Sequence, residues 1–118
     1  MSFGSYIHEL QSILEQIINT QAANIHRAGL LVADAIAAGG LVHTFGTGHS
    51  RLIAEEAFFR AGGIAAVNPI LDESLFFQHG ALASTRAERE PGLAARLLNQ
   101  VEVRSGDAAI LVSNSGCN

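Results

Sequence analysis

The chain has 118 residues, of which 48% are hydrophobic and 15% charged, and a formal net charge of −4 at pH 7. This composition predicts one globular domain with its own core and excludes a disordered chain. The acidic balance, with scattered arginines and no lysine, argues against a nucleic-acid-binding surface. One cysteine, Cys117, excludes an internal disulfide and fits a cytoplasmic protein. Apolar runs fall far short of the ~20 residues of a membrane-spanning helix, so we expect no membrane partner.

Residues 4–38 carry the pattern of a long amphipathic helix that ends at Gly39-Gly40. Its apolar side chains recur at three- and four-residue spacing: Ile7, Leu10, Leu14, Ile17. Asn19-Thr20 is a candidate kink or break, with Thr20 as a second N-cap. The wide apolar stripe predicts packing on the sheet and against another subunit, so we expect a homodimer or homotetramer.

Short apolar runs then alternate with helical patterns. Strands are expected at residues 41–45, within 64–71 and at 108–112, and helices at 51–61 and 93–101. The segment 72–92 lacks clean periodicity and is a candidate lid. This order predicts right-handed crossovers, and hence an α/β fold: a three-layer α/β/α sandwich around a parallel sheet. A strand and loop so close to the last residue predict that residues 1–118 form one domain that is the amino-terminal part of a longer protein, truncated after the third strand.

Two small-residue loops follow the first and third expected strands, at residues 45–50 and 113–116. Parallel strands bring such loops together at the carboxyl edge of the sheet, where α/β proteins bind ligands. The first loop departs from a dinucleotide fingerprint at Arg51, and a P-loop needs a lysine that the chain lacks. Hydroxyls and backbone N–H groups without fixed positive charge suit a phosphate monoester. The alternative is that each serine only caps a helix or a turn.

The stretches 41–50 and 105–116 resemble the SIS (sugar isomerase) domain family. The second stretch combines a Gly-Asp turn, an aliphatic strand and a Ser-x-Ser-Gly loop, which together look like that family's phosphosugar signature. The resemblance covers nearly the whole chain and is strongest to a phosphoheptose-isomerase-like subgroup. It implies a flavodoxin-like sandwich with a parallel sheet, usually dimeric or tetrameric, that binds phosphorylated sugars.

The resemblance also implies roles for individual loop residues. Ser113 and Ser115 would hold the phosphate, with backbone groups of Asn114 and Gly116. The first loop would line the sugar; its residues are Gly46, Thr47, Gly48, His49 and Ser50. Phosphoheptose isomerases carry a catalytic glutamate ten residues after the serine of this loop, and Arg60 occupies that position here.

Aldose–ketose isomerisation needs a base to move a proton between adjacent carbons. Glu56, Glu55 and His49 are the candidates. The glutamates have an alternative reading as exposed ion pairs with Arg60 and Arg51, four residues away. His49 has an alternative as a solvent-facing loop residue. The histidines lack metal-ligand spacing, so we expect no metal and no cofactor.

The sequence therefore predicts a protein that binds a sugar or amino-sugar phosphate, with isomerase chemistry of the aldose–ketose type. The alternative is a non-catalytic module that senses the same ligand, which Arg60 favours. Which sugar it binds, and what His79 and the segment 72–92 do, are questions that the sequence leaves open.

Overall fold

A computed structural model describes residues 2–116, so Cys117 lies outside the described residues. The chain divides into two compact units, residues 1–34 and 35–118, which are described separately. The predicted single domain is not tested by this division. The long helix α1 (Phe3–Ala37) supplies nearly all of the first unit.

Helix α1 runs without interruption, so the break expected at Asn19-Thr20 is wrong. The Thr20 hydroxyl donates to the carbonyl of Gln16 at 2.7 Å, a bond within the helix that replaces the capping bond we expected. Helix α1 ends at Ala37, and Gly39 (φ +80°) supplies the left-handed turn that stops it.

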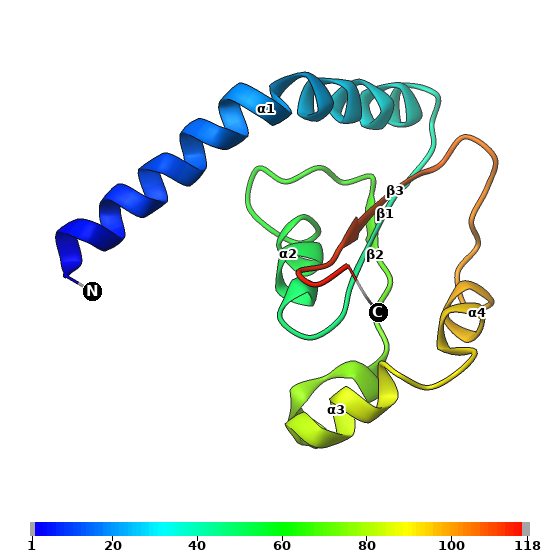
Figure 1. Ribbon diagram of the computed structural model, residues 1–118. Coiled ribbons are helices and arrows are strands. Elements are labelled where there is room, and N and C mark those ends of the chain that lie inside the picture. The colour runs from blue at the N-terminus through cyan, green and yellow to red at the C-terminus, as the bar shows by residue number, and fades with distance from the viewer. Residues whose placement is uncertain (1, 117–118) are drawn as a thin grey trace. The chain divides into compact units, whose positions relative to one another are not determined.

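The second unit is built on three parallel strands in the order β2-β1-β3 (Figure 1). They are β1 (Val42–Gly46), β2 (Val67–Pro69) and β3 (Ala108–Val112). The first and third predicted strands are confirmed, and the second lies within the predicted range 64–71. The α/β fold with a parallel, flavodoxin-like sheet is therefore confirmed.

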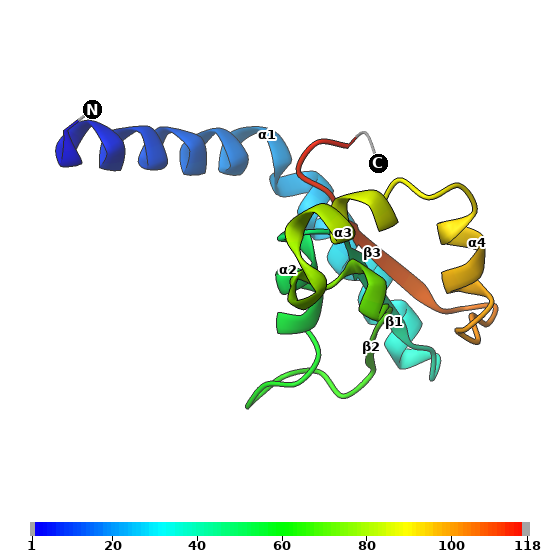
Figure 2. The ribbon, with the colours of Figure 1, turned by 90° about the horizontal axis from the view of Figure 1, so that it is seen from below.

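Successive side chains of the central strand β1 point to opposite faces of the sheet and contact a different helix on each face. The Thr44 hydroxyl is buried and donates to the carbonyl of Ala54 in α2 (Ser50–Glu56) at 2.9 Å. On the opposite face Phe45 packs against a core cluster that includes Leu93 and Leu97 of α4 (Leu93–Leu98). Figures 1 and 2 both show α2 and α4 on opposite sides of the strands.

Helix α2 ends at Glu56, five residues before the predicted end. The backbone N–H of Phe58 bonds to the carbonyl of Glu55, which closes the last turn early. Phe58 and Phe59, which follow this end, are 47% and 92% exposed in the described chain. Ser50 is not the N-cap: His49 takes that place and makes no side-chain capping bond.

The segment 72–92 is folded onto the core. It contains two 3-10 turns, η1 (Glu73–Leu75) and η2 (Phe77–His79), and helix α3 (Ala81–Ala87). Leu75 belongs to the core cluster, and Ser84 is buried with its hydroxyl donating to the Leu75 carbonyl at 2.9 Å. The turns explain why the sequence has no single period here.

Candidate functional site

Strand β1 ends where its backbone nearly touches the first turn of α2. A Cβ on Gly46 would lie 2.7 Å from the backbone carbonyl carbon and oxygen of Ser50, so only glycine fits. The Ser50 N–H donates to the Thr47 carbonyl at 3.1 Å, which closes the loop. This loop is therefore shaped by close approach of backbone to backbone.

The loop after β3 is exposed and is held by a side chain. The Gly116 N–H donates to Ser113 Oγ at 2.8 Å, and Gly116 has a positive φ of 66°. A hydroxyl that accepts one hydrogen bond still has its own proton to donate. Ser113 can therefore shape the loop and bind an anion at once.

The two loops meet at the carboxyl edge of the sheet. Strands β1 and β3 are paired in register from Val42↔Ala108 to Gly46↔Val112, so the loops start side by side. A hollow of about 290 Å³ lies between them. Its lining combines hydroxyls, one amide, one imidazole and one carboxylate: Thr47, His49, Ser50, Glu88, Ser113, Asn114, Ser115.

This hollow unites most of the predicted binding residues with His49. The ring of His49 is also 5.1 Å from that of Phe77, centroid to centroid. The predicted loop glycines Gly46, Gly48 and Gly116 belong to the same two loops but do not line the hollow. None of these contacts tests the role of a residue, so the site stays a prediction.

The predicted catalytic glutamates lie elsewhere on α2. Glu55 Oε1 is 3.4 Å from Nε of Arg51, and Glu56 Oε1 is 2.6 Å from Nη1 of Arg60. Both pairs match the alternative reading as ion pairs four residues apart. Neither glutamate lines the hollow described by residues 2–116.

Arg51 is mostly buried, unlike the surface residue of an exposed ion pair. Its side chain is 16% exposed and its guanidinium carbon lies 4.0 Å from the ring centroid of Phe76, a cation–π contact. Its Nε is the one buried side-chain nitrogen or oxygen within residues 2–116 that lacks a hydrogen-bond partner. Arg51 thus ties α2 to the segment after β2.

Glu88 is the lining residue that sequence reasoning missed. It follows α3 directly and is half-buried. Nothing in the sequence singles it out within the charged stretch 86–90, because the turns around α3 remove any periodic signal.

The opposite end of the strands carries a buried polar network. His43 Nε2 lies 3.1 Å from Asp107 Oδ2, and the Asn68 amide lies 3.1 Å from His43 Nδ1. Asp107 also accepts the N–H groups of Leu41 and Arg104, each at 2.8 Å. The N–H of Leu41, followed by that of Arg104 and by His43, holds the pKa of Asp107 well below its usual range. The network joins β1 and β2 to the turn before β3.

A larger hollow of about 520 Å³ lies beside Asn68 to Leu71 and residues 100–104. It contains none of the loop residues, so its size does not make it the better candidate. Among residues 2–116 no group of three or more histidine, cysteine, aspartate or glutamate side chains is placed to hold a metal ion. Within the same residues, no helix combines the length and apolar character that crossing a membrane requires.

Comparison with known proteins identifies the class to which this fold and site belong. The sequence pattern of the SIS domain matches residues 5–118, so the chain belongs to the SIS domain family. It is 42% identical over 115 residues to a UPF0309 protein of Listeria innocua, covering 98% of this chain and 47% of that protein. A UPF0309 protein of Geobacillus kaustophilus is 37% identical over 115 residues (98% and 46%), and one of Brucella ovis 41% over 113 (96% and 47%). The chain thus spans about half the length of the curated relatives it matches.

Proposed function

We propose that the hollow between the two loops binds a phosphorylated sugar or amino sugar. The observation that carries this proposal is that four hydroxyl side chains from loops more than 60 residues apart line one small hollow. Neutral donors can hold a phosphate without any positive side chain, as anion-binding loops do. SIS domains are associated with phosphosugar ligands, which supports this choice of ligand.

We further propose that the full-length protein interconverts aldose and ketose forms of this phosphosugar. The loop serines would anchor the phosphate and thereby orient the sugar carbons for proton transfer, which supplies a large part of the rate enhancement. His49 lines the same hollow, which supports a role for it in carrying protons between sugar oxygens.

A non-catalytic phosphosugar sensor is the second candidate. It is favoured by Arg60, which occupies the position of the catalytic glutamate in phosphoheptose isomerases and is paired with Glu56. Solvent-deuterium incorporation into a bound sugar phosphate, followed by NMR, separates the two, because a sensor binds the sugar without exchanging its carbon-bound protons.

We also propose that the protein works in the cytoplasm as a homodimer or homotetramer. The apolar stripe of α1 supports assembly, because side chains such as Leu14 and Ile25 are 59% and 58% exposed. The single cysteine supports the compartment. Light scattering on the full-length protein measures the assembly directly, and a monomer at all concentrations would contradict it.

The binding proposal is tested by thermal shift on the full-length protein with hexose 6-phosphates and heptose 7-phosphates. We expect a phosphosugar to raise the melting temperature, and Ser113→Ala to weaken its binding by about tenfold, because a hydrogen bond to a charged group is lost. Ser12→Ala, an exposed serine of α1, is the matched control. A shift that survives Ser113→Ala unchanged would contradict the site, and no shift with any sugar phosphate would contradict the ligand.

A further inference from the structure

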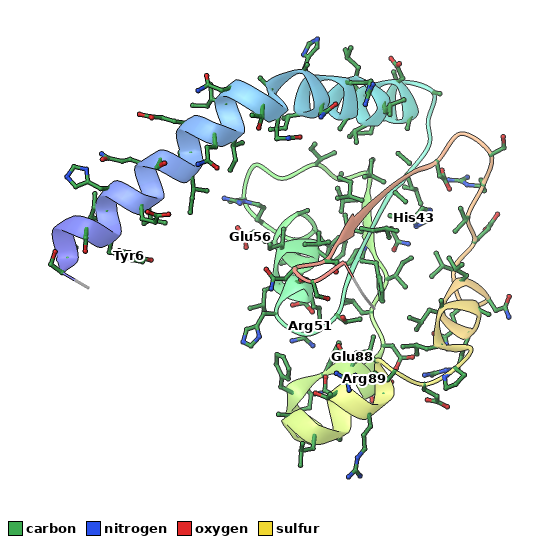
Figure 3. All side chains as sticks on the ribbon, viewed as in Figure 1. Tyr6, His43, Arg51, Glu56, Glu88 and Arg89 are labelled. Carbon is green, nitrogen blue, oxygen red and sulfur yellow. The ribbon has the colours of Figure 1, made fainter. Side chains whose placement is uncertain are left out.

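We infer that Glu88 is the catalytic carboxylate of this site, an assignment that rests on the proposed isomerase function. It is the one acidic side chain that lines the hollow between the two loops, as far as residues 2–116 describe it. Figure 3 labels Glu88 at the end of α3, where that helix comes closest to the start of α2. The carboxylate therefore shares one small space with the hydroxyls proposed to hold the substrate.

The backbone of Glu88 is fixed by the core. Its N–H donates to the Ser84 carbonyl at 3.0 Å, and the buried Ser84 hydroxyl donates in turn to Leu75. Ala87, its neighbour, packs against the core cluster of Leu75, Leu93 and Leu97. A general base must be held in position relative to the carbon it deprotonates, and this anchoring supplies that requirement.

The candidate glutamates of α2 are less well placed for the same task. Glu56 is 66% exposed and paired with Arg60, and Glu55 is paired with Arg51. Both lie outside the lining of the hollow. Position therefore favours Glu88 over either, although Glu88 lies 32 residues after Glu56 and 33 after Glu55 in the chain.

The isomerisation balances with one carboxylate and no oxidant. Glu88 takes the proton from C2 of the aldose, the electron pair of that C–H bond forms the C1–C2 double bond, and His49 gives O1 a proton, so that an enediol forms. The hydroxyl proton at O2 is then lost, the carbonyl forms at C2, and the carboxylic acid of Glu88 returns its proton to C1. His49 is placed to move the proton between the two oxygens.

The charge of Glu88 also bears on ligand binding. A carboxylate and a phosphate repel each other. Removing the charge should leave phosphosugar binding unchanged or tighter.

The test compares Glu88→Gln, Glu88→Asp and Glu90→Gln in the full-length protein. Glu90 is exposed, lies two residues further on and is outside the hollow, so it controls for loss of one charge in the same segment. The probes are the hexose and heptose phosphates that shift the melting temperature. The readouts are kcat, KM, and deuterium incorporation at C1 and C2 in heavy water.

We expect Glu88→Gln to lower kcat and deuterium incorporation at least 100-fold while KM stays within about threefold or falls. Glu88→Asp should recover part of the exchange, and Glu90→Gln should match the unmodified protein. Turnover by Glu88→Gln within threefold of the unmodified protein overturns the assignment and leaves the isomerase standing. Loss of exchange in Glu56→Gln with retention in Glu88→Gln does the same.

Failure of the underlying function gives a different result. If the unmodified protein binds a sugar phosphate but exchanges no carbon-bound proton, the protein is a sensor and Glu88 has no catalytic role. If the unmodified protein binds none of the probes, the phosphosugar site is wrong and the assignment of Glu88 fails with it.

Discussion

At the amino-terminal end of the strands, polar side chains are buried and bonded to one another, whereas at the carboxyl end they lie in loops around an open hollow. The Asp107 side chain is 1% exposed and accepts hydrogen bonds from two backbone N–H groups and from His43. Ser113 and Ser115 are exposed. The same sheet therefore uses one set of polar groups to fix strand positions and leaves the other set exposed around the hollow, where we propose that a ligand binds.

The largest effect should come from breaking the buried end. Asp107→Ala leaves the N–H groups of Leu41 and Arg104 and the ring of His43 without their acceptor. We expect the melting temperature to fall by on the order of 10 °C, because buried donors without partners are costly. Asp34→Ala, at an exposed position of α1, is the control and should change little. Equal melting temperatures for the two variants would show that the network is not stabilising.

A smaller effect should follow at the carboxyl end from Gly46→Ala. The new methyl group would meet the backbone of Ser50 at 2.7 Å, so α2 must shift away from β1. We expect a loss of about 1–3 kcal/mol in the free energy of unfolding, together with loss of phosphosugar binding. Gly29→Ala in α1 meets nothing within 4 Å and should raise stability by up to about 1 kcal/mol. Urea unfolding measures the stability of both variants. Unchanged phosphosugar binding by Gly46→Ala would show that the binding site does not depend on the shape of this loop.

The smallest effect is expected from protonation of Asp107, which lies at the buried, amino-terminal end of the strands. The folded-state pKa of Asp107 lies below its unfolded value of about 3.9, so its stabilising contribution is complete above that pH. The contribution is lost as pH falls from about 4 toward the folded pKa. Urea unfolding between pH 7 and pH 2.5 should show this loss, and Asp107→Asn should reduce it. If the stability of Asp107→Asn falls with pH as steeply as that of the unmodified chain, the acid dependence does not come from Asp107.

Sequence patterns predicted the elements whose residues have one periodicity and one environment. The strand at Ala108–Val112 is five aliphatic residues after a Gly-Asp turn, and the structure places it there. The predicted helix at 51–61 ends early because a terminal turn at Phe58 closes it. The spacing of apolar residues does not predict such a turn. The two loops were predicted as neighbours because parallel strands leave little choice of where they meet.

Glu88 could not be predicted in the same way. Its place in the hollow depends on how two 3-10 turns and α3 fold back over the sheet, and that path is set by the burial of Leu75 and Ser84. Charged residues in an aperiodic segment look alike in sequence, so Glu88 and Glu90 differ only once the chain is folded.

Pro69 makes the two edges of the sheet unequal. The N–H of Ile70 and the carbonyl of Ala66 bond to β1. Because backbone groups alternate along a strand, those of Val67 and Pro69 face away from β1, toward the open edge. Proline has no N–H to offer there, which blocks the β2 edge against another strand. Strand β3, with Leu111 74% exposed, has no such block. The β3 edge therefore accommodates a further strand more readily than the β2 edge does.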